Sequence, residues 1–588
     1  MSARLWGVIA FFLVGATLVL FASVFNQDFV AYDDGAYVTG NPLVNQGVSW
    51  TGVWEAFTTL NSGASYWHPL TWISHQVDYA FFGPVAGWHK LVNVIFHCFN
   101  TVILFGLLYR VKKSLGPPAA VAALFAWHPL HVESVVWVSE RKDLLSTFFG
   151  FVTFHCYLDY RLKQTRVRYV LVVMSCACAL MSKPMMVTLP VLLLLLDFWV
   201  WNENPTALGA CDRFSRLLWD KIPLLIMSLG VGIVTVLAQN ELGIMPSVSE
   251  LPVSFRVANA LQSYWIYAAQ SVVPVGLAVC YPYPETFALG RVFLALVFFV
   301  FVSMLAVRAR VRRPYITFGW AWFVVSLLPV IGLIQTSTQA RADRYTYLPL
   351  VGLFVLLIWG MNELVSRHRQ SVFWILGCVA LAVYVPLSWR QIGFWENSVT
   401  LFRRAVNVTD GNVLMHVALA DSLDWNLETE DASYHYRRAV DCDPENWAVY
   451  ESAARFFRNR RNLGLERIYL QKSLFWSPNQ PDLLNRLAHI LACHPDPCER
   501  NRDLALELAT QACALQTPGA MLYEHTLAAA MANSGDFSQA VRLTEAALGD
   551  KSVPQTVGIL HRLDLYRQGL PYRDLLLPRR NTGPPHGN

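Results

Sequence analysis

The sequence predicts an all-α membrane protein in two parts: a polytopic domain of about 11 transmembrane helices, followed by a tetratricopeptide-repeat α-solenoid. Three observations predict this fold class. Hydrophobic residues make up 54% of the 588-residue chain and charged residues only 15%, which is far from the composition of a soluble domain. Apolar segments long enough to cross a bilayer recur through residues 1–389, and a 34-residue period follows them.

The apolar segments of residues 1–389 each approach the roughly 20 residues that a helix needs to span a bilayer. They lie near residues 5–25, 90–109, 118–138, 144–160, 169–182, 184–201, 219–238, 289–307, 315–335, 345–364 and 371–388. The first is interpreted as an uncleaved anchor, because its apolar run is long and no clear signal-peptide cleavage site precedes Asp28. Residues 256–279 are interpreted as an interfacial segment, because polar residues interrupt the apolar pattern and Pro274 ends it.

Lysine and arginine residues indicate which loops face the cytoplasm. They gather at 110–113, 161–168, 308–313 and 367–369, whereas the loop 26–89 contains none. The amino terminus is therefore expected inside, and the loop 26–89 and everything after residue 389 outside. In a bacterial inner membrane, the expected location, the outside is the periplasm.

Residues 390–570 have the pattern of tetratricopeptide repeats. Asp410, Pro444 and Pro478 are spaced by 34 residues, and each follows a similar stretch, at 402–406, 436–440 and 470–474. A 34-residue helix-turn-helix unit that ends before a proline is typical of this repeat. The next proline in phase, Pro518, follows after 40 residues, and a last unit begins at Met521. Such an array presents a concave surface to peptide or protein; an array that only packs or oligomerises is the alternative. Residues 571–588 are predicted to be a flexible tail.

Several positive charges outside the cytoplasmic loops need another explanation. They are Arg141, Lys142, Lys183, Arg256, Arg341 and Arg344. Most of them lie at the ends of apolar segments on the external side, where a charge near hydrocarbon usually marks a site or a pairing network. Together they could bind the phosphate of an anionic headgroup. The alternative is that they pair with Glu133, Asp143, Asp343 or lipid phosphates.

Asp33 and Asp34 lie close to the point where the chain leaves the first apolar segment. A carboxylate near the membrane and beside a like charge can have a raised pKa and remove a proton from a hydroxyl. Such a base opposite a phosphate clamp is what inverting transfer from a lipid phosphate needs. The alternative is a simple turn, because Asp-Asp-Gly is favourable turn sequence.

The histidines offer a weaker signal. His68 and His128 stand in the repeated tetrapeptide Trp-His-Pro-Leu, and the second copy continues to His131 and Glu133. These last three could bind a metal, but the proline breaks the helical register and no further ligand is fixed by the sequence. Phosphate hydrogen bonding or plain packing is preferred, so no metal is assigned. No glycine-rich nucleotide loop and no G-x-S-x-G motif is present.

An ordered series of motifs runs along the chain. It comprises Tyr32-Asp-Asp-Gly35, Trp67-His-Pro-Leu-Thr71, Trp88-His-Lys-Leu-Val-Asn-Val-Ile-Phe-His97, Trp127-His-Pro-Leu-His-Val-Glu-Ser134, Glu140-Arg-Lys-Asp-Leu-Leu145, Ser182-Lys-Pro184 and Arg344-Tyr-Thr-Tyr-Leu-Pro349, followed by the repeats. In this order the motifs resemble those of the transmembrane and tetratricopeptide-repeat-containing (TMTC) glycosyltransferases. Each motif alone is weak, but the series covers most of the chain.

The resemblance implies a GT-C fold, in which a helical membrane domain takes sugar from a polyprenyl-phosphate carrier and an acid of the first external loop serves the acceptor. Eukaryotic relatives of this kind transfer mannose to serine or threonine hydroxyls of secretory-pathway proteins. Carried over, Asp33 is the leading base candidate and Asp34 its neighbour. The donor-phosphate candidates are Arg141, Lys142, Lys183, Arg341 and Arg344, and the supporting candidates are His68, His89, His128, His131, Glu133 and Tyr345.

Two positions depart from the pattern expected of the relatives. Lys142 stands where a small residue is expected after Arg141, which leaves open which of the two contacts phosphate. Glu140 replaces a position often occupied by glycine, and a carboxylate there alters the pocket. The 40-residue repeat unit is more typical of bacterial arrays, so mannose is not assumed as the sugar.

The sequence therefore predicts an inverting membrane glycosyltransferase that uses a polyprenyl-phosphate-linked sugar. Its acceptor is expected to be a serine or threonine hydroxyl of a protein bound by the repeats, and no nucleic-acid partner is expected. No cofactor is assigned beyond the lipid-linked donor, and a divalent metal is not indicated. Two alternatives remain: an oligosaccharide or glycan ligase of the same fold, and a non-catalytic membrane-anchored repeat scaffold. A scaffold has no need for Asp33, Lys183 and Arg344 to converge.

Overall fold

A computed structural model describes residues 2–59, 67–203, 218–241, 252–334, 339–365, 370–516, 523–549 and 557–574. The chain divides into two compact units, Met1–Asp410 and Gly411–Asn588. Over the described residues the elements are helices, apart from an isolated bridge between Tyr281 and Arg341. The predicted all-α class is confirmed. Pro518, Met521 and residues 575–588 of the predicted tail lie outside the described residues.

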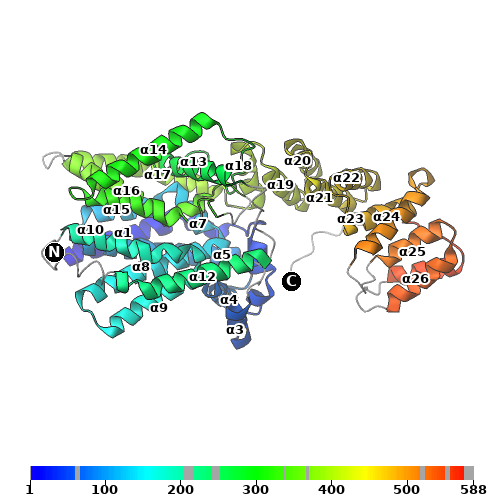
Figure 1. Cartoon of the computed structure of the whole chain (residues 1–588), viewed down its shortest axis with the longest axis horizontal. Coiled ribbons are helices and arrows are strands. Elements are labelled where there is room, and N and C mark those ends of the chain that lie inside the picture. The colour runs from blue at the N-terminus through cyan, green and yellow to red at the C-terminus, as the bar shows by residue number, and fades with distance from the viewer. Residues whose placement is uncertain are drawn as a thin grey trace. The chain divides into compact units, whose positions relative to one another are not determined.

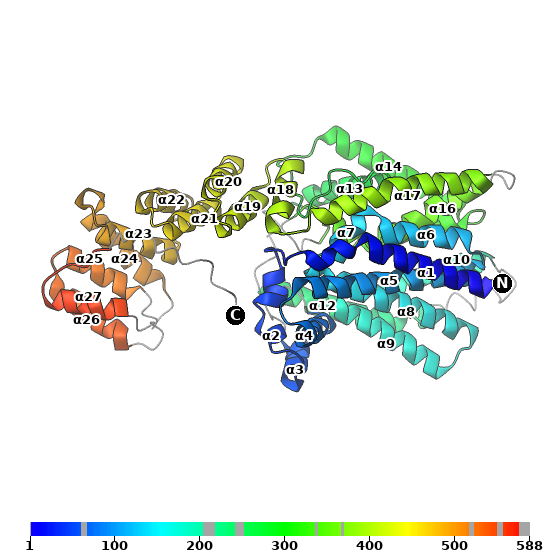
Figure 2. The same cartoon turned by 180° about the vertical axis from the view of Figure 1, so that it is seen from behind.

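The long helices of the first unit run side by side, with the amino terminus at one end and α2, α3 and α4 at the other (Figures 1 and 2). The unit begins with α1 (Ser2–Leu20), η1 (Ala22–Asn26), η2 (Gly35–Thr39), α2 (Pro42–Asn45), α3 (Trp50–Thr58), α4 (Pro69–Phe82), α5 (Ala86–Lys112) and α6 (Gly116–Trp127). Then follow η3 (Pro129–His131), α7 (Val132–Val136), η4 (Val138–Glu140), α8 (Arg141–Leu162), α9 (Arg166–Ser182), η5 (Pro184–Thr188), α10 (Leu189–Glu203) and α12 (Ile222–Glu241). The unit is completed by α13 (Val253–Gln270), α14 (Leu289–Ala309), α15 (Pro314–Leu327), η7 (Asp343–Thr346), α16 (Leu350–Leu364), α17 (Gln370–Gly393) and α18 (Ser398–Val408).

Five of the described helices are long and apolar enough to cross a membrane. They cover Arg4–Asn26, Ala86–Lys112, Ile222–Gln239, Leu289–Ala309 and Ser371–Gly393. The pair α6 and Pro129–Val136, bent by 53°, makes a sixth if it forms one broken span. The predicted count of about 11 is not confirmed. α10, α15 and α16 have only 14 to 15 residues, fewer than the roughly 20 of a spanning helix, and α8 carries charges at both ends.

Close packing inside the first unit relies on small residues. α15 and α16 cross at Gly319 and Gly352, where a Cβ atom on either glycine would overlap the carbonyl oxygen of the other. Small residues at such crossings let membrane helices approach closely. By contrast, most of the α14 surface is not buried within the unit, as expected of a helix that faces lipid.

Prolines divide the bundle into short pieces at the end where the polar residues gather. α6 ends at Trp127, two residues before Pro129, and α9 ends at Ser182, two residues before Pro184. Proline disfavours the helical conformation of the residue before it and cannot donate a backbone hydrogen bond. The turns η3, η4, η5 and η7 therefore place side chains at helix ends. α13 covers most of the predicted interfacial segment, and its interfacial position stays a prediction.

The second unit consists of helices that pack against their neighbours along the chain. Its helices are α19 (Val413–Trp425), α20 (Thr429–Cys442), α21 (Trp447–Asn459), α22 (Leu463–Trp476), α23 (Pro481–Cys493), α24 (Arg502–Leu515), α25 (Glu524–Asn533), α26 (Phe537–Gly549) and α27 (Val557–Arg567). The main contacts join α19 to α20, α21 to α22, α23 to α24 and α25 to α26. Asparagine side chains cap α19, α21, α22 and α24. Such pairing agrees with helix-turn-helix repeats, while the tetratricopeptide assignment stays a prediction.

Candidate active site

The loop between η1 and η2, which carries Asp33, is held by the segment that leads into α18. The backbone N–H of Asp28 donates to the carbonyl oxygen of Glu396 at 2.9 Å. The backbone N–H of Ala31 donates to the hydroxyl of Ser398 at 2.8 Å, although 367 residues separate the two. These hydrogen bonds fix the loop from outside the membrane-spanning helices.

Asp34 is fully buried, and its carboxylate holds the loop to η4. Its Oδ2 accepts a hydrogen bond from the backbone N–H of Val30 at 2.9 Å. Its Oδ1 accepts two from Ser139, from the backbone N–H at 3.1 Å and from the hydroxyl at 2.6 Å. Burial raises the pKa of Asp34, and these hydrogen bonds oppose the rise. With its oxygens occupied in this way, Asp34 has a structural role.

Asp33 differs from Asp34 both in its burial and in its hydrogen bonds. It is half-buried and lines a cavity. Within the part of the chain that the structure describes, its carboxylate accepts no hydrogen bond. Burial raises the pKa of Asp33, and the positive charges of Lys142 and Arg344 oppose the rise. Asp33 is therefore an available proton acceptor that faces two cations.

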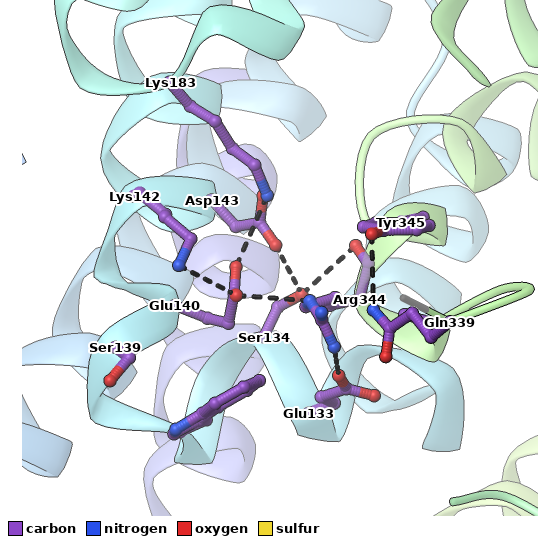
Figure 3. Close-up of polar contacts among 12 residues, drawn as sticks. Glu133, Ser134, Ser139, Glu140, Lys142, Asp143, Lys183, Gln339, Arg344 and Tyr345 are labelled. Atoms are coloured by element: carbon purple, nitrogen blue, oxygen red, sulfur yellow. Dashed lines mark hydrogen bonds and ion pairs between the residues drawn. The ribbon is translucent and has the colours of Figure 1, made fainter. Parts of the chain in front are cut away.

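Three cations converge on the carboxylate of Glu140 beside this cavity (Figure 3). Its Oε1 lies 3.1 Å from the Nζ of Lys142 and 3.2 Å from the Nε of Arg344. Its Oε2 lies 3.3 Å from the Nζ of Lys183. Burial alone would raise the pKa of Glu140, but the three cations lower it well below its ordinary value. Glu140 is therefore ionised in the folded protein.

Two further carboxylates, of Glu133 and Asp143, contact Arg344 and Lys183. Glu133 Oε1 lies 2.6 Å from Nη1 of Arg344, and Asp143 pairs directly with Lys183. Ser134 donates to Oδ2 of Asp143 at 3.1 Å. The Arg344 guanidinium also lies over two aromatic rings, each 5.1 Å away at its centroid. Arg344 is thus oriented by its contacts before any ligand arrives.

The cavity has a volume of about 1030 Å³ and combines a charged wall with an apolar one. The charged and polar lining residues include Tyr32, Asp33, Tyr37, His68, Glu140, Lys142, Lys183, Arg344 and Tyr345. The apolar lining includes Leu225, Leu229, Ile233, Val236 and Leu237 of α12, Met185 and Val187 of η5, and Leu328, Val330 and Ile334 after α15. Such a space suits a ligand with an anionic group and a hydrocarbon chain.

Arg141, adjacent to Lys142, faces a different side of the fold. Its Nη2 lies 2.7 Å from Oδ2 of Asp78, and its Nη1 donates to Ser74 at 2.8 Å. Its Nε donates to Oδ1 of Asn93. The side chain is fully buried and does not line the cavity. The structure thus brings Lys142, and not Arg141, to the predicted phosphate site.

Arg341 is also placed away from the cavity wall. Its guanidinium lies 3.9 Å from the centroid of the Tyr281 ring. Tyr281 in turn donates to Oδ1 of Asp343 at 2.8 Å. These contacts hold the chain just before η7 in place. Arg344, which lies in η7, extends toward Glu140.

The supporting residues predicted from sequence also divide into those that line the cavity and those that do not. His68 lines the cavity, stacked against the rings of Tyr37 and Trp72 at centroid distances of 5.6 and 4.8 Å. Tyr345 also lines it, and its hydroxyl accepts from Gln339 Nε2 at 3.3 Å. His68 and Tyr345 are the two supporting candidates that line the cavity. Glu133 does not line it but contacts Arg344, which does.

His128, His131 and Glu133 do not converge on a common point. Nδ1 of His131 lies 2.7 Å from the carbonyl oxygen of Phe125, and Nε2 of His128 lies 3.2 Å from that of Ser271. Glu133 instead contacts Arg344. The two histidines pack among aromatic rings, which is the packing role that the sequence left open.

A different group has the composition of a metal site. His75, Asp78 and His89 are buried, and their ligand atoms lie within 4.8 Å of one another, the one such group among the described residues. His89 Nε2 lies 2.9 Å from the carbonyl oxygen of Gly83. The Arg141 guanidinium on Asp78 supplies a positive charge there, and a buried cation beside another cation is costly. We therefore describe the group as the support of Arg141.

Sequence reasoning missed two tyrosines of the site. Tyr32 and Tyr37 flank the aspartate pair and line the cavity with Asp33. The hydroxyl of Tyr37 accepts from Nζ of Lys142 at 3.1 Å, and the Tyr37 ring lies 4.4 Å from the same nitrogen. Their placement on either side of Asp33-Asp34-Gly35 was the available signal. Tyr37 links the acid-bearing loop to the cation group.

Together, the fold and the site define a multi-pass helical membrane protein with a cation-lined cavity at its helix ends. No family model matches the chain. Its homologues are protein O-mannosyl-transferases of the TMTC family, which supports the resemblance stated from the motifs.

Among these relatives are protein O-mannosyl-transferase F38B6.6 of Caenorhabditis elegans, 23% identical over 74% of this chain and 62% of its own length. Human protein O-mannosyl-transferase TMTC1 is 23% identical over 74% of this chain and 55% of its own length. Human TMTC4 is 26% identical over 69% of this chain and 62% of its own length. The chain thus matches little more than half the length of these curated relatives.

Proposed function

We propose that this protein is a GT-C-type membrane glycosyltransferase that transfers a sugar from a polyprenyl-phosphate carrier to a hydroxyl of a protein, with inversion at the sugar. The observation that carries the proposal is the cavity where Asp33 faces Lys142, Lys183 and Arg344 beside an apolar wall. The homologues are named protein O-mannosyl-transferases, which favours a protein acceptor.

In the proposed reaction, Asp33 accepts the proton of the acceptor hydroxyl as its oxygen attacks the anomeric carbon of the sugar. The bond between that carbon and the phosphate oxygen breaks, and the electron pair leaves with the phosphate. Lys142, Lys183 and Arg344 stabilise the negative charge that develops there. Attack from the side opposite the phosphate inverts the anomeric configuration.

The surroundings of Asp33 suit a general base. A carboxylate whose oxygens are saturated, such as Asp34, would lose hydrogen bonds on protonation. Asp33 carries no such bonds among the described residues, and burial raises its pKa toward the range in which a base works well. The base role therefore belongs to Asp33 within the pair.

The donor chain is proposed to lie along the apolar wall formed by α12 and η5. The phosphate then lies at the cation group, and the sugar between it and Asp33. The repeats of the second unit are proposed to bind the protein acceptor. The loop 26–89 contains no lysine or arginine, which favours the outer face of the membrane for this chemistry, the periplasmic face in a bacterium.

The test uses the full-length protein in lipid nanodiscs, with a polyprenyl-phosphate-linked sugar and a serine- and threonine-rich peptide. Asp33→Asn should reduce transfer at least about 100-fold while the variant still binds the donor. Asp28→Asn, the same change at an exposed position of the same loop, is the matched control and should transfer normally. Full activity of Asp33→Asn would remove Asp33 from the base role.

The acceptor separates the proposal from the ligase alternative. Transfer to a glycan or lipid acceptor, with none to peptide, would identify a ligase of the same fold. Absence of transfer to any acceptor, together with no binding of polyprenyl phosphate, would favour the repeat scaffold. The convergence of Asp33, Lys183 and Arg344 on one cavity has no use in a scaffold.

A further inference from the structure

Glu140 occupies the place where the cations of the site meet. Its two oxygens receive contacts of 3.1 to 3.3 Å from Lys142, Lys183 and Arg344. These three residues come from different elements: the first turn of α8, the end of α9 and η7. Glu140 is 1% exposed, yet it forms part of the cavity wall.

The contacts of Glu140 are those that a phosphate group would need. A carboxylate and a phosphodiester each spread a negative charge over two oxygens, and lysine and arginine bind both kinds of group. The position where a phosphate would contact Lys142, Lys183 and Arg344 is therefore already occupied by a carboxylate of the protein itself.

Glu140 is the one carboxylate of the group that contacts all three cations. Lys142, Lys183 and Arg344 contribute three positive charges, and together they lower the pKa of Glu140, so its negative charge is present at neutral pH. Burial instead raises the pKa of Asp143 to about 7, so this carboxyl compensates Lys183 less fully. A phosphate that binds the three cations together would therefore have to take them over from Glu140 in particular.

We propose that Glu140 is a resident counter-ion that occupies the phosphate site in the empty protein and that the donor phosphate displaces. This inference rests on the proposed function, because it assumes that an anionic lipid phosphate binds in this cavity. Of the three carboxylates in contact with the cations, Glu140 is the one that lines the cavity, so an entering phosphate meets it first.

A resident counter-ion raises the binding free energy that any phosphate must supply to occupy the site. Inorganic phosphate gains only the cation contacts and must still displace Glu140. A prenyl phosphate also buries its hydrocarbon chain against the apolar wall, at roughly 25 cal/mol per Å² of apolar surface, and this burial offsets the displacement. Glu140 therefore weakens both ligands by a similar factor, and the lipid chain supplies the affinity that fills the site.

The test measures binding of a short-chain prenyl monophosphate to the full-length protein in detergent by calorimetry. Glu140→Gln keeps the side-chain shape but removes the competing charge, so prenyl phosphate should bind about tenfold more tightly, equivalent to about 1.4 kcal/mol. Inorganic phosphate should gain by a similar factor, because it displaces the same carboxylate.

Glu133→Gln is the matched control. It removes a carboxyl group that contacts the same Arg344, but Glu133 does not line the cavity. It should tighten binding less than Glu140→Gln does. Equal gains would show a general charge effect and would overturn displacement. Weaker or unchanged binding by Glu140→Gln would also overturn it, since Glu140 would then orient the cations for the phosphate.

The failure of this inference can be told from failure of the proposed function. If neither wild type nor Glu140→Gln binds prenyl phosphate, the donor assignment fails and the inference with it. If wild type binds prenyl phosphate and transfers sugar, but Glu140→Gln does not bind it more tightly, the proposed function stands and the counter-ion role is wrong.

Discussion

Arg141 and Lys142 are neighbours in the first turn of α8, yet they belong to two different charge clusters. The Arg141 cluster, with Asp78, Asn93 and Ser74, is closed: the donors of Arg141 are occupied, and none of the four residues lines the cavity of the candidate site. The Lys142 cluster, with Glu140, is open to a cavity of about 1030 Å³. Successive helical residues point about 100° apart, so one turn of helix serves both a structural and a ligand-binding cluster.

The comparison teaches how to recognise a functional cation. Both residues are charged and buried, so charge and burial alone do not separate them. What separates them is whether the partner carboxylate also faces a cavity. The following substitutions test that distinction, from the largest expected effect to the smallest.

Replacement of Arg141 should have the largest effect, and it should act on stability. Arg141→Gln leaves Asp78 as a buried carboxylate without its cation, which costs about 3–5 kcal/mol in comparable sites. We expect a marked fall of the thermal unfolding midpoint in detergent. The double variant Arg141→Gln with Asp78→Asn should recover part of the loss, because no charge is then left unpaired. A midpoint equal to wild type would show that the closed cluster contributes nothing.

Replacement of Lys142 should act mainly on the donor. Lys142→Gln removes one of the three cations around Glu140, and prenyl phosphate should bind about 30-fold more weakly, equivalent to about 2 kcal/mol. The fall in unfolding midpoint should be smaller than for Arg141→Gln, because Glu140 keeps Lys183 and Arg344. The two clusters would be functionally equivalent if Lys142→Gln lost stability and kept donor affinity.

The aspartate pair repeats the comparison on a smaller scale. Asp34→Asn should reduce the free energy of unfolding by about 1–2 kcal/mol. Its new amide group must face an N–H donor, either that of Ser139 or that of Val30. Thermal unfolding provides the measurement, and an unchanged midpoint would show that these hydrogen bonds do not hold the loop.

Asp33→Asn should have the smallest effect on stability, and the opposite sign. Because folding raises the pKa of Asp33, its contribution favours the folded state below the ordinary carboxyl pKa and is lost as the pH rises through the raised value. At neutral pH, Asp33→Asn should therefore be slightly more stable than wild type. The difference should shrink as the pH falls toward about 4, and a destabilised variant at neutral pH would contradict it.

The sequence predicted the helical class and the positions of most apolar helices, because hydrophobic periodicity and helix-breaking prolines act locally. That Asp33, Lys183 and Arg344 would lie near one another was expected from the topology and the order of the motifs, and the three residues line one cavity; their roles stay predictions. The number of spans could not be settled in the same way, since short helices such as α10 and α16 fall below the bilayer thickness and depend on their neighbours.

The direction of each side chain could not be read from the sequence. The sequence left open whether Arg141 or Lys142 contacts phosphate, and whether Asp33 or Asp34 is the base. The two residues of each pair carry the same charge and differ only in the partners that the fold brings to them. Arg341 and His89 were grouped with the site for their charge and motif, and the structure places them in other contacts. Glu140 was noticed as a departure, but its contact with three cations depends on α9 and η7, which lie far along the chain.

The hydrogen bonds from Asp28 to Glu396 and from Ala31 to Ser398 have a practical consequence for dissecting the protein. A membrane portion cut at residue 389, the boundary suggested by hydropathy, would end inside α17. It would lack Glu396 and Ser398, two residues that accept hydrogen bonds from the loop carrying Asp33. A fragment intended to retain donor binding should extend through α18, to Val408.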